Sequence, residues 1–436
     1  MTRNQRAVAL LLLASLNAFG FIDRVVVALV AQKVKAEFLL TDLDIGLLGG
    51  TAFALVNMFA AVPVARLAER FSRARVTAAF LMIGSLFTTL AGFTASFAQL
   101  LACRLGMAAG SAATEAPPHS IISDMYPPEK RASAISIFML GVPIASLLGS
   151  AAGGLIAQHF GWRRTFLVFG LAGGVIALLC LAFLKEPGRK ASLGTTPKMG
   201  TLQVLGLLLG RANLRWITLG VCFVSLGSFG VNTFLPAFLS RDFGLDAGQA
   251  GSLFGLISGI ASLVGTLAGG YASEHLAKRD PRWLLGLPAL GSVIGAPVFV
   301  IGVMSGSLTI AVPLMLVGSF AFYTAMGPCI ATLHGSLDSY SRATGSALFL
   351  MVMHLIGQGL GPPLIGLVSD MLSSMLYAGG PFAADCAGAA AQVPGSACAA
   401  ASAHGLRYAM AVFAIFFVLA GVLLYLGARS GHKAMR

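Results

Sequence analysis

The sequence predicts an all-α integral membrane protein with twelve transmembrane helices in two pseudo-symmetric bundles of six. Composition is the first observation: 57% of the 436 residues are hydrophobic, 10% are charged, and the mean hydropathy is +0.86. Because a spanning helix needs about 20 apolar residues, the chain has room for about a dozen spans and little else. The other two observations are a long polar interruption near the middle and a loop pattern that occurs once in each half.

Apolar runs bounded by charged or turn-forming residues predict the individual helices. Their expected ranges are 7–35, 43–67, 75–97, 98–125, 131–158, 164–185, 214–240, 247–274, 283–304, 307–336, 342–376 and 405–428. The polar interruption separates six helices from six. It predicts three domains, which are an N-terminal bundle (1–185), a cytoplasmic linker (186–213) with an interfacial helix over 201–210, and a C-terminal bundle (214–436).

The distribution of basic residues predicts the topology. Of the 29 Lys and Arg residues, 21 lie in loops on the side of the N-terminus, six lie on the opposite side and two lie within spans. By the positive-inside rule, both termini are expected in the cytoplasm. The net charge of +13 therefore comes from basic residues in the loops between spans, and no nucleic-acid partner is expected. The first apolar run is too long for a cleaved signal peptide, so we expect a retained span.

The internal repeat consists of ARLAERFSRAR at 65–75 and GYASEHLAKRDPRW at 270–283. Each copy places a small residue, an acid and a basic cluster at a tight turn between the second and third helices of its half. Two related bundles around a central cavity are therefore expected, as in transporters built from repeats.

The first loop resembles the G-x-x-x-D-R-x-G-R-R signature of the major facilitator superfamily, with Ala65, Glu69, Arg70, Arg73 and Arg75 at its positions. Other stretches are similar to the spinster family of this superfamily. They are FIDR in the first span, IISDMYPPEKRASAISIFMLGVPIASLLG, FGWRRTF, KRDPRWLLGLPALG, HLIGQGLGPPLIGLVSD and GLRYAM. The resemblance implies a secondary transporter that alternates between inward-open and outward-open states, with no cofactor.

The spinster resemblance also implies an amphipathic substrate of the lysolipid or sphingoid type, proton coupling, and a monomer in the inner membrane of a bacterial cell. An organic-anion or drug carrier of the same superfamily is the alternative, because the anion:cation symporters also carry an aspartate–arginine pair in span one. An enzyme or a receptor is disfavoured. The sequence offers no nucleophile with a base, no metal-ligand spacing and no soluble sensing domain.

The charged stripe of the fourth predicted span holds the main site candidates. Arg104, Ser111 and Glu115 fall on one face of a helix, and charges within an apolar span indicate function. The spinster pattern has a glutamate seven residues after the arginine, where this chain has Ser111. Glu115, one turn closer to the cytoplasm, is interpreted as a second proton site, a substrate contact or a buried group bonded to nearby hydroxyls.

Asp23 and Arg24 in the first span have two interpretations. Burial in a low-dielectric cavity favours the protonated form of a carboxyl group, which would make Asp23 a proton acceptor. Alternatively, Asp23 belongs to a structural ion pair. In both cases we expect Asp23 to contact Arg104, since the two residues lie at similar depth. His119, one turn after Glu115, is a relay candidate or a hydrogen-bonded structural residue.

Charged residues at the cytoplasmic loops are candidates for a conformational latch, in which an acid pairs with a base in one state and releases it in the other. Solvated positive-inside charge is the alternative interpretation. The candidates are Glu69, Arg70, Arg73, Asp124, Arg131 and Glu274.

The second half carries polar residues without a strong acid among them. Asn232, Tyr323, His354 and Gln358 are candidate substrate contacts or interhelical hydrogen-bond partners. The long outer loop expected at 376–404 contains Cys386 and Cys398. In an oxidising compartment they would form a disulfide, although the Ala- and Gly-rich loop also fits a flexible segment with two free thiols.

Overall fold

The computed structural model describes residues 3–114, 116–187, 206, 208, 210–337, 342–387 and 393–434, and this part of the chain contains helices and no strands. Among these residues, eleven helices are long and apolar enough to cross a membrane. The chain forms two compact units. Unit 1 comprises Met1–Leu40, Thr51–Leu193 and Leu245–Gly255, and unit 2 comprises Thr41–Gly50, Gly194–Gly244 and Leu256–Arg436.

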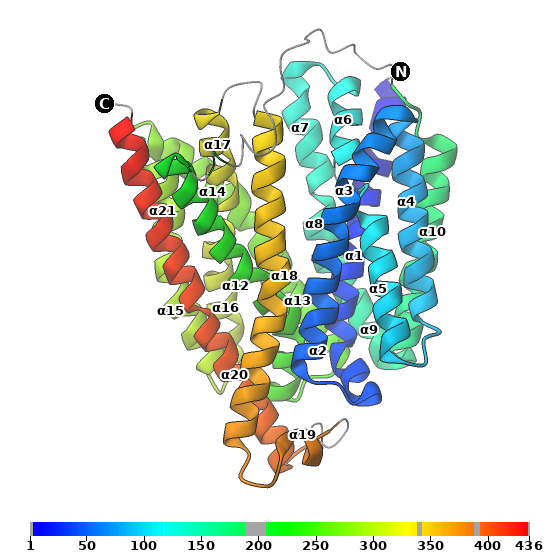
Figure 1. Ribbon diagram of the computed structural model, residues 1–436, viewed down its shortest axis with the longest axis vertical. Helices are drawn as coiled ribbons and strands as arrows, with labels where there is room; N and C mark the ends of the chain where they lie inside the picture. Colours follow the sequence, from blue (N-terminus) through cyan, green and yellow to red (C-terminus); the bar gives the residue numbers. More distant parts are fainter. Residues whose placement is uncertain are drawn as a thin grey trace. The chain divides into compact units, whose positions relative to one another are not determined.

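Unit 1 is built around a helix pair that runs side by side, α4 and α10 (Figure 1). Small residues allow this close approach: a Cβ atom on Gly173 of α10 would lie 2.5 Å from Ser85 Oγ of α4. The helices of the unit are α1 (Arg3–Phe38), α3 (Ala52–Arg70), α4 (Arg73–Ala91), α5 (Phe97–Ser111), α6 (Ala116–Met125), α7 (Pro128–Met139), α8 (Gly141–Ile144), η2 (Ala145–Gly149), α9 (Ser150–Phe160), α10 (Trp162–Phe183) and α13 (Ala247–Phe254).

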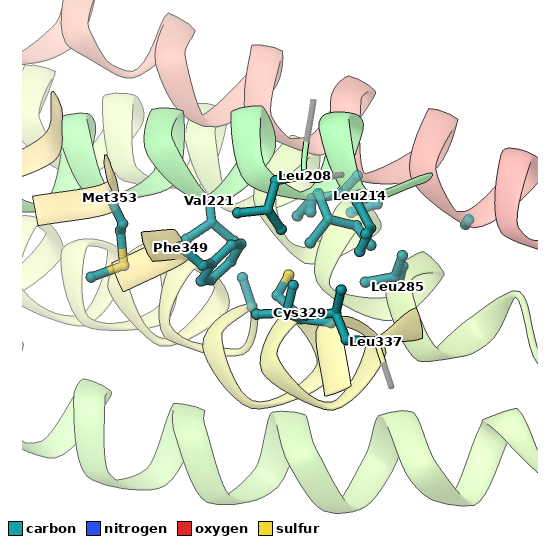
Figure 2. Packing of buried hydrophobic residues seen from close by; sticks show 14 of the residues in the cluster. Leu208, Leu214, Val221, Leu285, Cys329, Leu337, Phe349 and Met353 are labelled. Atoms are coloured by element: carbon teal, nitrogen blue, oxygen red, sulfur yellow. The ribbon is translucent and has the colours of Figure 1, made fainter. Parts of the chain in front are cut away.

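Unit 2 packs α12 against α18 and α21, and a cluster of buried aliphatic, aromatic and sulfur-containing side chains fills the space between α12, α15, α17 and α18 (Figure 2). Val221, Cys329 and Phe349 are each at most 1% exposed within this cluster. The helices of the unit are α2 (Asp42–Gly46), α12 (Ala212–Phe243), α14 (Ala261–Ala277), α15 (Trp283–Met304), α16 (Leu308–Tyr323), α17 (Met326–Ser336), α18 (Arg342–Leu376), α19 (Phe382–Asp385), α20 (Ala397–Phe413) and α21 (Ile415–Ala434).

The fourth predicted helix, 98–125, is divided into α5 and α6, so the prediction of one continuous helix was wrong. Prolines explain the break, because Pro117 and Pro118 have no N–H group for the carbonyls of Ala113 and Thr114. The chain instead closes a tighter turn in which Thr114 N donates to Ser111 O at 3.0 Å. The tenth predicted helix divides in the same way between α16 and α17, since Pro328 cannot donate to Thr324 O.

Each unit contains one short segment whose neighbours in sequence belong to the other unit. Residues 41–50 pack in unit 2 and residues 245–255 pack in unit 1. Both lead into a π-helical stretch, η1 (Leu47–Thr51) before α3 and η3 (Gly255–Ile260) before α14. Glycines permit the close packing: a Cβ on Gly46 would lie 2.5 Å from Pro362 O, and one on Gly251 would lie 2.6 Å from Ser150 O. The repeat predicted from the loops therefore extends to the second helix of each half.

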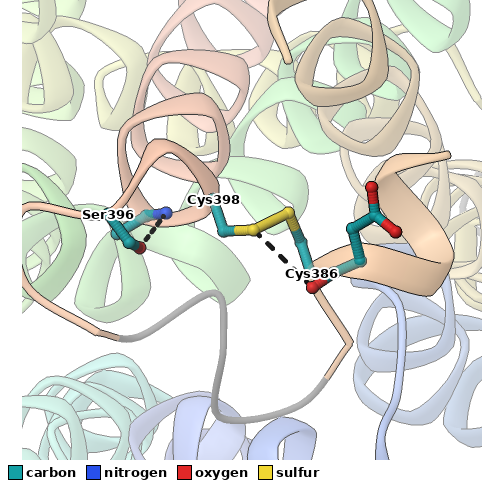
Figure 3. Close-up of a disulfide and its surroundings, with 5 residues drawn as sticks. Cys386, Ser396 and Cys398 are labelled. Atoms are coloured by element: carbon teal, nitrogen blue, oxygen red, sulfur yellow. Dashed lines mark hydrogen bonds between the residues drawn. A yellow bond between two sulfur atoms is a disulfide. The ribbon is translucent and has the colours of Figure 1, made fainter. Parts of the chain in front are cut away.

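The last predicted helix begins earlier than expected, at Ala397 instead of 405. Ser396 caps the alanine-rich start, because its side chain accepts a hydrogen bond from Ala399 N. The preceding loop is correspondingly shorter, and a disulfide joins Cys386 at the end of α19 to Cys398 in the first turn of α20 (Figure 3). The predicted linker, 186–213, lies largely outside the described residues, as does its interfacial helix. The predicted domain boundaries therefore stay predictions.

A buried acid and two arginines as the candidate functional site

The candidate site lies within unit 1, where α1, α4 and α5 meet. Asp23 on α1 is 8% exposed and Arg104 on α5 is 1% exposed. Arg104 donates to the backbone carbonyl of Asp23 at 3.0 Å, so the expected contact between the two residues is present. Asp23 Oδ1 lies 2.8 Å from the hydroxyl of Thr88 on α4, and that hydroxyl also lies 2.9 Å from Gly84 O. The Asp23 carboxyl group therefore shares a hydrogen bond with a neutral hydroxyl.

The aromatic ring of Phe53 on α3 contacts both arginines of the site. Arg24 Cζ is 4.7 Å and Arg104 Cζ is 4.6 Å from the ring centroid, and Arg24 Cζ is also 5.4 Å from the Phe21 ring. Phe53 is fully buried. Cation–π attraction favours guanidinium groups at these positions. Phe53 was not predicted, because an isolated phenylalanine in an apolar span has no sequence signal that separates it from core packing.

Polar groups continue from this site to the break between α5 and α6. Ser111 is buried and accepts a hydrogen bond from Asn57 Nδ2 of α3 at 2.9 Å. Thr114 donates from its hydroxyl to Ser111 O at 2.7 Å. Glu115 lies outside the described residues, so its role stays a prediction. His119 of α6 contacts the Phe138 ring edge to face, with 5.1 Å between ring centroids.

The basic residue at the start of α4, Arg73, is the centre of a second charged group in unit 1. Its guanidinium donates to Asp124 Oδ2, to Glu186 Oε1 and to Ser120 Oγ, each at 2.7 Å. Glu186 also accepts from Ser72 Oγ and from Ala74 N, both at 2.9 Å. Burial acts to raise the pKa of Glu186, but these hydrogen bonds hold that pKa below its usual range. Glu186 was missed, because it is the first residue of the predicted charged linker and was counted with it.

The other latch candidates do not gather around Arg73 in the described part of unit 1. Arg131 donates to Tyr126 O at 3.2 Å, which holds it to the turn that precedes α7. Arg70 is exposed, and the side chain of Glu69 lies outside the described residues. Glu274, the counterpart in unit 2, is also exposed. The latch function stays a prediction for all of these residues.

Two of the polar candidates of unit 2, Asn232 and Tyr323, are joined by a hydrogen bond. Asn232 donates to Tyr323 Oη at 2.9 Å and accepts from Ser258 Oγ at 2.7 Å, which links α12, α16 and η3. The His354 ring lies 5.7 Å from the Phe229 ring. Gln358 is 3% exposed on α18.

A buried ion pair in unit 2 had no local sequence signal. Arg241 on α12 contacts both carboxylate oxygens of Asp42, at 2.6 and 2.7 Å, and Ser369 donates to Asp42 Oδ2 at 2.7 Å. Asp370 accepts from the backbone N–H groups of Asp42 and Leu43, at 3.0 and 2.8 Å, and so binds the start of α2. The partners are too far apart in sequence for a helical spacing to connect them.

Comparison with known proteins identifies the family of the chain. A model of the Major Facilitator Superfamily matches residues 11–362. An MFS-type efflux pump of Mycolicibacterium smegmatis is 31% identical over 84% of this chain and 85% of its own length. A sphingosine-1-phosphate transporter of Danio rerio is 26% identical over 82% of this chain and 74% of its own length. The crystal structure of a bacterial homologue of the human lysosomal transporter spinster superposes with a TM-score of 0.88 at 29% identity, covering 99% of both chains.

These matches cover the two units and bear out the predicted superfamily, fold and transport role. The family model spans the charged site, the Arg73 group and most of unit 2. The chain belongs to the major facilitator superfamily, within its spinster family, and is a multi-pass membrane transporter and not an enzyme.

Proposed function

We propose that the protein is a proton-coupled transporter in which Asp23 gains and loses the coupling proton. The observation that carries this proposal is the position of the Thr88 hydroxyl between two acceptors, Asp23 Oδ1 and Gly84 O. A hydroxyl has one proton and can donate it to only one of them at a time. When Asp23 is ionised, Thr88 donates to it. When Asp23 is protonated, its own O–H donates to Thr88, whose proton then goes to Gly84 O.

The arginine contact also leaves the Asp23 carboxyl group free to change its charge. Arg104 donates to the backbone carbonyl of Asp23, which accepts a hydrogen bond in either protonation state. The positive charge nearby favours the ionised form, whereas burial opposes it. These opposing effects are what a group needs if it is to exchange a proton during a transport cycle.

We propose an amphipathic organic substrate with an anionic head and an apolar tail, of the lysolipid or sphingoid type. Arg24 and Arg104 both contact the ring of Phe53, so the site combines cationic and apolar groups, which an anionic head and an apolar tail can each use. The similarity to a sphingosine-1-phosphate transporter supports this substrate class. An organic-anion or drug carrier is the second candidate, supported by the similarity to an efflux pump. We place both termini in the cytoplasm of a bacterial inner membrane on the basic-residue bias, and we expect a monomer.

Transport in proteoliposomes containing a pH-sensitive dye tests the proposal. Sphingosine-1-phosphate, lysophospholipids and small hydrophilic anions are the substrates to compare. We expect substrate-dependent proton flux in the native protein and none in Asp23→Asn, while Asp44→Asn, which changes an acid of unit 2, retains flux. Normal flux in Asp23→Asn would refute the proton assignment. Flux with hydrophilic anions alone would refute the amphipathic substrate and leave the carrier alternative.

A further inference from the structure

A cavity of about 470 Å³ lies in unit 1 where the end of α10 meets the start of α4. The apolar span of α10 ends at Phe183, so the cavity lies at the end of this candidate spanning helix. Its wall combines apolar and charged side chains. The lining includes Ser72, Arg75, Leu181, Leu184, Lys185 and Glu186.

The charge presented by the cavity is positive. Arg75 and Lys185 are both exposed, and in the described part of the chain neither forms an ion pair. The acid in the wall, Glu186, is already engaged by Arg73, Ser72 and Ala74, and its lowered pKa keeps it ionised against Arg73. Two cationic side chains therefore remain for a ligand.

Apolar surface continues from the cavity along the outer face of α10. Leu171, Leu178 and Leu181 share one side of α10 and are 63%, 57% and 46% exposed, as expected of side chains that face lipid. A small soluble anion has no group that would use this surface. A membrane lipid has both parts, an anionic headgroup at the interface and acyl chains beside the span. Basic pockets at the ends of spanning helices are suited to such headgroups.

We propose that this cavity binds the anionic phosphodiester headgroup of a membrane phospholipid. The phosphate lies between Arg75 and Lys185, and the acyl chains follow the apolar face of α10. The chemistry of recognition is that of a phosphate group, and the lipid is favoured over free phosphate by the adjoining apolar surface. This site is separate from the one at Asp23, Arg24 and Arg104.

Native mass spectrometry and thermal unfolding of the purified full-length protein test the proposal, with phosphatidylglycerol, phosphatidylcholine and soluble glycerol 3-phosphate as probes. We expect phosphatidylglycerol alone to bind and raise the melting temperature. In Arg75→Gln/Lys185→Gln, binding should weaken about 30-fold, because each base near the membrane surface contributes about a factor of five to six. Lys278→Gln/Arg279→Gln, which removes two exposed bases in unit 2, should bind like the native protein.

The single variant Lys185→Gln provides a milder change if the double variant does not fold, and it should weaken binding about fivefold. Undiminished phosphatidylglycerol binding in either variant would overturn the proposal, because the lipid would then be held elsewhere, for example at Arg24 and Arg104. Equal stabilisation by phosphatidylcholine would show that the net negative charge of the headgroup does not contribute to binding, which would also overturn the proposal. Equal stabilisation by glycerol 3-phosphate would assign the cavity to a soluble phosphate and overturn the lipid assignment.

Discussion

The two units each contain a buried aspartate beside an arginine, but the two pairs differ in which atoms meet. In unit 2, Arg241 holds both carboxylate oxygens of Asp42, and Ser369 donates to one of them as well. In unit 1, Arg104 bonds the main chain of Asp23, and the carboxyl group meets the hydroxyl of Thr88. A bidentate pair fixes the charge of its acid, whereas a hydroxyl partner accommodates either protonation state.

This difference separates the two interpretations that the sequence leaves open for Asp23. A structural ion pair has the geometry of Asp42 and Arg241, in which the guanidinium group contacts both carboxylate oxygens. Separating the two groups would leave a buried charge without its partner. Asp23 has another geometry. The comparison therefore supports the proposal that Asp23 titrates and that Asp42 joins the 41–50 segment to unit 2.

The largest effect is expected from breaking the pair in unit 2. Asp42→Asn leaves Arg241 buried opposite a neutral amide. Removing one partner of a buried ion pair lowers the free energy of unfolding by about 3–5 kcal/mol. Asp23→Asn should cost less than about 1.5 kcal/mol, because its amide oxygen can still accept from Thr88. The melting temperatures of the two purified variants measure the difference.

A double variant controls for the shape of the amide side chain that replaces Asp42. Asp42→Asn/Arg241→Gln removes both charges and should recover part of the lost stability. Equal losses in Asp42→Asn and Asp23→Asn would contradict the distinction between the two pairs.

A smaller effect is expected from the ring that both site arginines share. Phe53→Leu removes two cation–π contacts, each contributing about 0.5–2 kcal/mol, so binding of an anionic amphiphile should weaken about tenfold. Phe53→Trp should retain binding, since it keeps an aromatic face. Phe21→Leu, which affects Arg24 alone, should have a smaller effect. Binding isotherms of the four proteins test this order, and equal losses in Phe21→Leu and Phe53→Leu would show that the shared ring has no special role.

The smallest effect concerns Glu186, an acid of unit 1 that pairs with Arg73. Its pKa is lowered from 4.5 in the folded protein, so its contribution to stability is present above that value and is lost as the pH falls through the folded-state pKa. The melting temperature of the native protein should therefore fall more steeply than that of Glu186→Gln below about pH 4.5. Glu274→Gln, at an exposed acid, should follow the native curve. Identical curves for the native protein and Glu186→Gln would contradict a stabilising role for this carboxylate.

The helices were predictable because apolar runs of spanning length have few alternatives, and the comparisons bear out the fold class. The break after Ser111 was not predictable, because prolines are compatible with a bend and with a full interruption. The hydrogen bond from Thr114 N to Ser111 O distinguishes the two, and the sequence does not reveal it. The contact between Asp23 and Arg104 followed from their depth in antiparallel spans. The partners of Asp42 and Glu186 could not be predicted, because these pairs depend on contacts between segments that are distant in sequence.

The protonation state of Asp23 is the most direct test of the account. Infrared difference spectroscopy across pH detects the carbonyl stretch of a protonated carboxyl group. We predict that the difference between the native and Asp23→Asn spectra contains a titrating carboxyl band from Asp23. The same band should persist in Asp124→Asn, whose acid is bound to Arg73. Native and Asp23→Asn spectra that superimpose at every pH would contradict the assignment of the coupling proton to Asp23.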